Sequence, residues 1–311
     1  MSFSQSVKEE ILNSAKKIKG CCATSFLTAV LKSIGSICVD SNGYGFSVET
    51  DNGELLMFSA ELVERTFNTE CSVFQISGDN GKNAKFMCRF DLSLGEKLNL
   101  TFSDDEGLHL TETPIVNLTK PCCRRAFVQA LFLTCGSTTI PESNDSLYQS
   151  NHSNYHLELR FSNVDFANFV QKEFAELGFK QTTRKNSTVL YLKDSEKIAD
   201  FFVFVDAINA KFTVENIIIG RSYRNNANRQ SNCIDSNINK SVQASGKQVA
   251  AIAKIRAAGK FELLAPQLQQ IAIAREANPE ANLAELAAVL GISKSGVNHR
   301  LTKLLEIAAD L

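Results

Sequence analysis

An internal repeat with a spacing of 101 residues constrains the fold of this chain more than any other feature of its sequence. The segment KGCCATSFLTAVLKSIGSIC, residues 19–38, aligns without a gap on KPCCRRAFVQALFLTCGSTT, residues 120–139, and seven of the twenty positions are identical. Each copy predicts an apolar helix of about three turns that ends at a glycine, which we expect in the left-handed conformation common at helix C-termini. These glycines are Gly35 and Gly136. The chain is therefore expected to contain two related halves.

The similarity of the two halves continues beyond these helices. In each half an alternating segment predicts a strand, a helix-compatible stretch follows, and two short segments predict a hairpin. The expected elements are residues 44–49, 59–67 and 72–77 with 84–90 in the first half, and 155–161, 164–177 and 179–184 with 188–192 in the second. Ala29 and Ala130 would let the two repeat helices approach closely. We predict an α+β fold with pseudo-twofold symmetry.

Length and composition limit the class of protein. With 311 residues, 44% of them hydrophobic, the chain is long enough for two domains. No segment reaches the roughly 18 consecutive apolar residues of a membrane span, and residues 1–19 are polar and charged, unlike a signal peptide. We therefore expect a cytoplasmic protein without membrane contact.

The nine cysteines predict neither disulfides nor a metal site. Their number is odd, two pairs are adjacent in sequence, and no CxxC unit is present to supply zinc ligands. We interpret them as reduced thiols that mostly pack as small hydrophobic residues. The sequence thus predicts no metal and no cofactor.

The C-terminal segment has the pattern of a helix-turn-helix, from about Arg275 to Ala308. A helix at residues 266–277 begins with a proline and ends before Asn278-Pro279. Asn282 is a predicted N-cap of a short helix at residues 283–290, with Glu285 placed to return a hydrogen bond to the cap. Gly291 supplies the turn that follows. In this arrangement the last helix fits the major groove of DNA.

The last helix is expected to have a buried stripe and a polar face. Ser293 caps it, and apolar residues recur at spacings of four, three and four: Val297, Leu301, Leu304 and Ala308. The opposite face carries the candidate contacts to double-stranded DNA: Lys294, Ser295, Asn298, His299 and Lys303, with Arg300 at the edge. The net charge is only -1, but no acid lies between Glu285 and Glu306, so this helix is locally basic. A packed or merely exposed histidine stays an equal interpretation of His299.

Residues 219–248 are rich in Asn, Ser and Arg, and we expect a linker that becomes helical near Asn237. Residues 221–240 contain four basic residues and the single acid Asp235, which makes them a candidate for phosphate contacts: Arg221, Arg224, Arg229 and Lys240. A solvated spacer between two domains is the equal alternative.

The paired helices resemble those of the LAGLIDADG homing-endonuclease fold, in which two such helices pack at the centre of a saddle formed by the strands. That resemblance places the metal-binding acid immediately before the final glycine of each helix. Here Ile34 and Cys135 stand at these positions, and Lys32 and Leu133 occupy the other acidic position of the motif. None is a hard oxygen ligand for magnesium, so we predict no nuclease and no enzyme. A helix pair without nuclease ancestry is the alternative.

The combination of parts resembles the WhiA family of sporulation and cell-division regulators. The residues that carry the resemblance are the two CC-containing helices, the strand YHLELRF, the closing LAELAAVLGISKSGVNHRLTKLLEIA and the NRQSNCIDSNINK stretch with Asn228, Arg229, Asn232, Cys233, Asn237 and Lys240. Ser241 and Ser245 depart from residues that relatives tend to carry. The likeness implies a non-catalytic LAGLIDADG-like domain joined to a helix-turn-helix, acting in transcription control, cell division or chromosome segregation, with sporulation in some relatives.

We accordingly predict three parts: a degenerate LAGLIDADG-like domain at residues 1–218 with repeats at about 1–115 and 116–218, a basic linker at 219–240, and an all-α DNA-binding domain at 241–311. The predicted function is that of a sequence-specific, nucleoid-associated transcription regulator. The alternative is a protein-interaction scaffold whose first domain recruits a partner and whose DNA binding is weak or non-specific. No pattern in the sequence specifies a target DNA sequence, an oligomeric state or the partner of the first domain.

Overall fold

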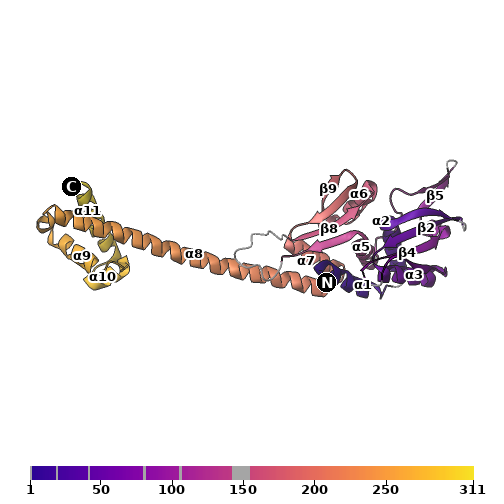
Figure 1. The fold of residues 1–311 in the computed structure, drawn as a ribbon, viewed down its shortest axis with the longest axis horizontal. Helices are drawn as coiled ribbons and strands as arrows, with labels where there is room; N and C mark the ends of the chain where they lie inside the picture. The colour runs from indigo at the N-terminus through magenta and orange to yellow at the C-terminus, as the bar shows by residue number, and fades with distance from the viewer. Residues whose placement is uncertain (1, 19, 41–42, 80–81, 105–106, 142–154) are drawn as a thin grey trace. The chain divides into compact units, whose positions relative to one another are not determined.

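The computed structural model describes residues 2–18, 20–40, 43–79, 82–104, 107–141 and 155–311. The chain divides into two compact units, Met1–Arg221 and Ser222–Leu311 (Figure 1). Each unit is built around its own hydrophobic core. Among the described residues, no helix is long and apolar enough to cross a membrane.

The first unit contains two copies of one supersecondary arrangement. The first copy comprises α2 (Cys21–Ile34), β1 (Gly35–Asp40), β2 (Gly43–Thr50), α3 (Gly53–Phe67), β3 (Ser72–Asp79) and β4 (Lys82–Asp91). The second comprises α5 (Pro121–Cys135), β7 (Gly136–Thr139), β8 (His156–Phe161), α6 (Val164–Glu173), a 3-10 turn at Ala175–Leu177, β9 (Lys180–Arg184) and β10 (Ser187–Leu192). Both four-stranded antiparallel sheets have the same order, β1-β2-β4-β3 and β7-β8-β10-β9. The predicted repeat is thus a repeat of structure.

Further elements of this unit lie outside the repeated arrangement. They are α1 (Phe3–Ala15), α4 (Leu92–Lys97), the strand pair β5 (Thr101–Asp104) and β6 (Gly107–Leu110), α7 (Ser195–Phe204) and the start of α8 (Ile208–Ala257). The repeat helices α2 and α5 pack directly against one another, with α1 also against α5. Ala29 and Ala130, expected at the crossing of these helices, are both fully buried.

The second helix of each copy begins at an asparagine. The Asn52 side chain accepts a hydrogen bond from the Leu55 amide, 3.0 Å, at the start of α3. The Asn163 side chain does the same for the Phe166 amide, 2.9 Å, at the start of α6. An N-cap satisfies one of the amide groups that the first turn of a helix leaves without a partner, so it fixes where the helix begins. The sequence pattern predicts that the first of these helices begins at residue 59, whereas the cap sets its start at Gly53.

The glycines that end the repeat helices are not left-handed, which corrects our expectation. Gly35 and Gly136 have extended φ values of -80° and -89°, and each begins a strand. Space is the reason for glycine at these positions. A β-carbon at Gly35 would lie 2.4 Å from the carbonyl oxygen of Leu31, and one at Gly136 would lie 2.6 Å from that of Phe132. The strand therefore turns directly across the end of its helix, which only glycine permits without a shift.

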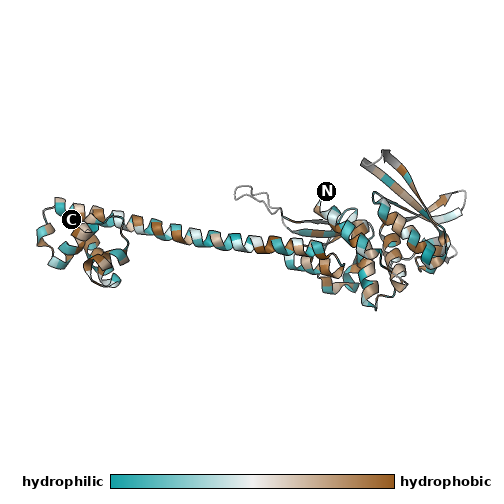
Figure 2. Ribbon diagram, turned by 90° about the horizontal axis from the view of Figure 1, so that it is seen from below, coloured by the Kyte–Doolittle hydropathy of each residue, from teal (hydrophilic) through white to brown (hydrophobic). Residues whose placement is uncertain are grey.

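Residues 219–240 do not form an irregular linker, contrary to our expectation. They lie inside α8, a continuous helix of 50 residues. Figure 2 shows both hydrophilic and hydrophobic residues along this helix. Asn and Ser have modest helix propensity, but the segment contains no proline and a single glycine, Gly220. The low apolar content of residues 219–240 is therefore compatible with a helix that is exposed to solvent.

The second unit contains the later part of α8, a 3-10 turn at Phe261–Leu263, α9 (Pro266–Ala277), α10 (Leu283–Leu290) and α11 (Lys294–Ala309). Helices α9, α10 and α11 pack against one another. Their core includes Ile252, Ile255, Ile271, Leu286, Val297, Leu301 and Leu304. The bounds expected for α9 and α10 are confirmed, and α11 ends one residue after the expected Ala308.

Candidate nucleic-acid interface

The turn between α10 and α11 has the predicted local geometry. A capping box starts α10: the Asn282 side chain accepts from the Glu285 amide at 3.1 Å, and the Glu285 carboxylate accepts from the Asn282 amide at 2.8 Å. Gly291 ends the helix with φ of 62°, the left-handed region that glycine favours. The Ile292 amide then donates to the Ala287 carbonyl at 3.1 Å, which closes the turn.

Ser293 fixes the start of α11, and the buried stripe fixes its orientation. The Ser293 hydroxyl accepts a hydrogen bond of 3.1 Å from the Gly296 amide. All four predicted stripe residues, Val297, Leu301, Leu304 and Ala308, are at most 5% exposed. The opposite face is therefore held toward solvent, because one side of an amphipathic helix is committed to the core.

The structure brings the predicted base-contacting residues together on this exposed face. Lys294, Ser295, Asn298, His299 and Lys303 are all exposed, and Arg300 is half-buried at the edge. Within the part of the chain that the structure describes, no acid pairs with Lys294 or Arg300. Lys303 differs, because its ammonium lies 2.9 Å from the Glu306 carboxylate. That hydrogen bond raises the pKa of Lys303. The charge available to a ligand is therefore concentrated toward the start of the helix.

Three basic residues of the second unit have hydrogen-bond partners within the protein. Arg275 is 2% exposed and donates to the carbonyl oxygens of Asn278 and Ala281. Lys254 donates to the Ala308 carbonyl at 2.8 Å, near the end of α11. Arg256 forms two hydrogen bonds with Glu276, and its guanidinium lies 3.6 Å from the Phe261 ring centroid. Their contacts join helices and turns of the second unit, so these basic residues contribute to its packing.

The four basic residues expected to contact phosphates all lie on α8. Arg224, Arg229 and Lys240 are exposed, and Arg221 is half-buried with its guanidinium 5.5 Å from the Tyr155 ring centroid. Arg229 and Lys240 are eleven residues apart, which is about three helical turns and places them on the same side. A helix presents such charges in a fixed row, whereas an irregular linker would not.

The ends of the two repeat helices meet at a hollow of about 520 Å³ in the first unit. Ile34 and Cys135, which stand where the resembled nucleases carry acids, both line it. Lys32, at the other motif position, donates to the Thr111 carbonyl, and Leu133 is buried. Glu158 is the one carboxylate among the described lining residues.

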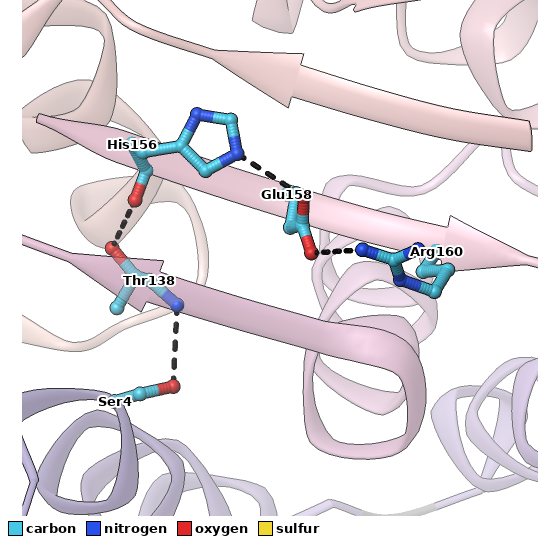
Figure 3. Close-up of polar contacts among 5 residues, drawn as sticks. All are labelled: Ser4, Thr138, His156, Glu158 and Arg160. Atoms are coloured by element: carbon cyan, nitrogen blue, oxygen red, sulfur yellow. Dashed lines mark hydrogen bonds and ion pairs between the residues drawn. The ribbon is translucent and has the colours of Figure 1, made fainter. Parts of the chain in front are cut away.

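Glu158 lies between two polar partners on β8. Its carboxylate oxygens lie 3.1 Å from His156 Nε2 and 2.9 Å from an Arg160 guanidinium nitrogen (Figure 3). On the neighbouring strand, Thr138 donates through its hydroxyl to the His156 carbonyl and through its amide to Ser4. Burial alone would raise the pKa of Glu158, but the hydrogen bonds from His156 and Arg160 outweigh it and lower that pKa. A carboxylate so engaged is a structural anion.

Comparison with known proteins gives the affiliation of the chain. Two family models match, described as the WhiA LAGLIDADG-like domain over residues 124–224 and the WhiA C-terminal HTH domain over residues 227–308. A "Probable cell division protein WhiA" of Lachnoclostridium phytofermentans is 33% identical over 324 residues, covering 100% of this chain and 99% of the relative. The chain belongs to the WhiA family. A protein of the same name from Caldicellulosiruptor bescii is 32% identical over 329 residues, covering 100% of this chain and 96% of the relative.

A solved WhiA structure has the same fold. It is described as the "Crystal structure of full-length DUF199/WhiA from Thermatoga maritima", with a TM-score of 0.54, 21% identity, and coverage of 100% of this chain and 99% of that chain. The expected family and the expected fold class, a LAGLIDADG-like α+β domain followed by a helical helix-turn-helix domain, are therefore confirmed.

Proposed function

We propose that this WhiA-family chain is a sequence-specific binder of double-stranded DNA that regulates transcription, with α11 as its recognition helix. The observation that carries the proposal is the exposed polar face of α11, held outward by the buried Val297, Leu301 and Leu304 stripe. An α-helix with side chains is about 10–12 Å wide, which matches the major groove at about 12 Å. The helix-turn-helix model that matches residues 227–308 supports the same docking mode.

The residues near the start of α11 are the proposed readers of base edges. In this class of motif the first turns of the recognition helix lie deepest in the groove, which selects Lys294, Ser295, Asn298 and His299. Asn298 can form a bidentate pair with adenine, and Lys294 can donate to guanine. Ser293 contributes by fixing the helix start, and its hydroxyl also lies 3.0 Å from that of Ser295.

Phosphate contacts are assigned to basic residues farther from the groove. Arg300 and Lys303 lie about one and a half to two and a half turns along α11. A phosphate contact would replace the exposed ion pair of Lys303 with Glu306. An exposed ion pair of this kind contributes only about 0–1 kcal/mol to stability, so its replacement by a phosphate contact costs little free energy. On α8, Arg229 and Lys240 on one side of the helix would add charge without reading sequence, and Arg224 would add charge from another side.

The first unit is proposed to have no nuclease activity. Metal-assisted phosphodiester cleavage needs carboxylates at the ends of the paired helices to hold magnesium. Ile34 and Cys135 stand there instead, and the nearby Glu158 is engaged by Arg160 and His156. The nuclease-like fold would then serve as a scaffold for the DNA-binding unit or for a protein partner.

The relatives named as probable cell division proteins support a role in cell division, with chromosome segregation and sporulation as further expected settings. A regulator of this kind would act in the cytoplasm at the nucleoid. Genome-wide mapping of DNA bound by the tagged chain tests the proposal. Enrichment of one short motif, lost when α11 is altered, is the expected result. A protein that maps uniformly over the genome yet co-purifies with a constant partner would instead support the scaffold alternative.

A further inference from the structure

Four cysteines from the two repeats come together in the first unit. The Sγ atoms of Cys21, Cys22, Cys122 and Cys123 all lie within 4.8 Å of one another. Cys21 and Cys122 are exposed and only Cys123 of the four is fully buried, so these cysteines do not all pack as small hydrophobic residues. Burial of small apolar groups therefore does not explain why each repeat helix begins with two adjacent cysteines.

The separations fit ligands of one metal ion. Four thiolates around zinc have Zn–S bonds of about 2.3 Å, and a regular tetrahedron of that size has S···S edges of about 3.8 Å. All six Sγ separations within 4.8 Å are compatible with that tetrahedron after small side-chain movements. An iron–sulfur cluster would distribute the four thiolates over several iron atoms and hold opposite sulfurs farther apart. Soft thiolate ligands in tetrahedral array favour zinc over magnesium or calcium.

The backbone around these thiols also suits bound thiolates. Cys21 and Cys22 form the first turn of α2, and Cys122 and Cys123 lie in the first turn of α5. The N-terminal end of a helix carries partial positive charge and amide groups without helical partners, which stabilise anionic sulfur. Among the described residues, neither first turn contains an acid and neither helix has a side-chain N-cap. Two helix ends thus converge on the group of sulfurs without a competing anion.

We propose that Cys21, Cys22, Cys122 and Cys123 bind a single zinc ion that ties the two repeats together. Binding converts four thiols into thiolates and releases their protons to solvent, with no change in oxidation state. The helices are 14 and 15 residues long, so the ion would lie about 20 Å from the hollow at Gly35 and Gly136. It would be a structural site, remote from the positions that hold metal in the resembled nucleases.

Zinc content of the full-length chain tests the proposal. The protein is purified under reducing conditions, loaded with zinc, passed through a chelating resin and analysed by elemental mass spectrometry. We expect one zinc per chain, and cobalt loading should give the thiolate charge-transfer and tetrahedral d–d bands. The variant C21S/C122S changes only the two exposed cysteines of the group, so the buried packing is kept. Loss of outer-shell partners alone weakens metal affinity by about 10- to 100-fold, so removal of two ligands should weaken it more.

The variant C38S/C233S is the matched control, because it removes two cysteines outside the group. It should retain one zinc per chain, and zinc should raise the unfolding temperature of wild type and control but not of C21S/C122S. Absence of zinc from the reduced wild type would overturn the proposal, as would equal zinc in C21S/C122S. Isolation of the anaerobically purified chain with a disulfide among these four cysteines and no metal would also overturn it, in favour of a redox pair.

Discussion

The Arg275 guanidinium donates a hydrogen bond of 2.6 Å to the carbonyl oxygen of Ala281, across the turn that joins α9 to α10. The same nitrogen lies 3.3 Å from the carbonyl of Asn278, the C-cap of α9. Arg275 is almost completely buried, and burial lowers its pKa. This arginine therefore stabilises the helix-turn-helix from its interior.

Replacing Arg275 should consequently destabilise the second unit. Arg275→Gln leaves the Ala281 and Asn278 carbonyls without their charged donor, which we expect to cost about 2 to 4 kcal/mol. Arg300→Gln, at the half-buried edge of α11, should cost less than about 0.5 kcal/mol. Amide hydrogen exchange of residues 266–308 measures both. Equal protection in the two variants would show that Arg275 has no structural role.

The repeat helices should not tolerate a side chain at their terminal glycines. A β-carbon at Gly136 would lie 2.5 Å from Cδ2 of Phe132, so Gly136→Ala should destabilise the first unit by about 1 to 3 kcal/mol. Gly220→Ala is the matched control, because nothing lies within 4 Å of its β-carbon inside α8. That change should stabilise by about 0.5 to 1 kcal/mol. Denaturant unfolding of the first unit should separate the two variants in sign.

Acid should weaken the contacts that Glu158 makes. Its pKa is lowered by His156 and Arg160, so its contribution to stability is present above the pKa of the unfolded state and is lost as pH falls through the folded-state pKa. The difference in unfolding free energy between wild type and Glu158→Gln should therefore shrink as pH falls below about 4. A difference that grows below this pH would contradict the assignment of Glu158 as a stabilising anion.

Arg229 and Lys240 on α8 should contribute to the affinity for DNA but not to sequence specificity. Replacing Arg229 and Lys240 with Ala should weaken binding to every duplex alike and reduce the salt dependence by about 0.9 units of slope per lost contact. Asn225→Ala with Asn228→Ala changes the same helix without changing charge, and it should leave the slope intact. If the basic variant keeps the wild-type slope, α8 is only a spacer.

The sequence predicted those parts of the fold that local rules determine. Asn282, Gly291 and Ser293 act within a few residues of themselves, so the helix-turn-helix bounds could be found from caps and periodicity. The repeat alignment indicated a twofold arrangement, which the identical strand orders confirm. The first strand of each sheet was missed because Gly35 and Gly136 ended the apolar pattern and concealed the strand that starts there.

Contacts between residues that are far apart in the sequence could not be predicted from local patterns. The partners of Lys254 and Arg256, the Ala308 carbonyl and Glu276, lie on other helices, 54 and 20 residues away, and no spacing rule identifies them. The four repeat cysteines are an intermediate case. The two cysteine pairs align in the repeat, so pairing of the two repeat helices predicts that all four cysteines lie close together. The CxxC pattern does not describe this site, because each helix contributes two adjacent cysteines. The linker was misjudged because its composition is compatible with both a coil and a solvated helix.

Base reading by α11 is the central claim, and the binding of Asn298→Ala to specific and scrambled duplexes tests it most directly. A lost bidentate base contact removes discrimination, so this variant should lose about 1 to 3 kcal/mol on the preferred site and little on scrambled DNA. Lys303→Ala, on the same helix, should weaken both duplexes about equally, because it removes a phosphate contact. Both are titrated at one fixed salt concentration. Equal losses on the two duplexes for Asn298→Ala would contradict the account.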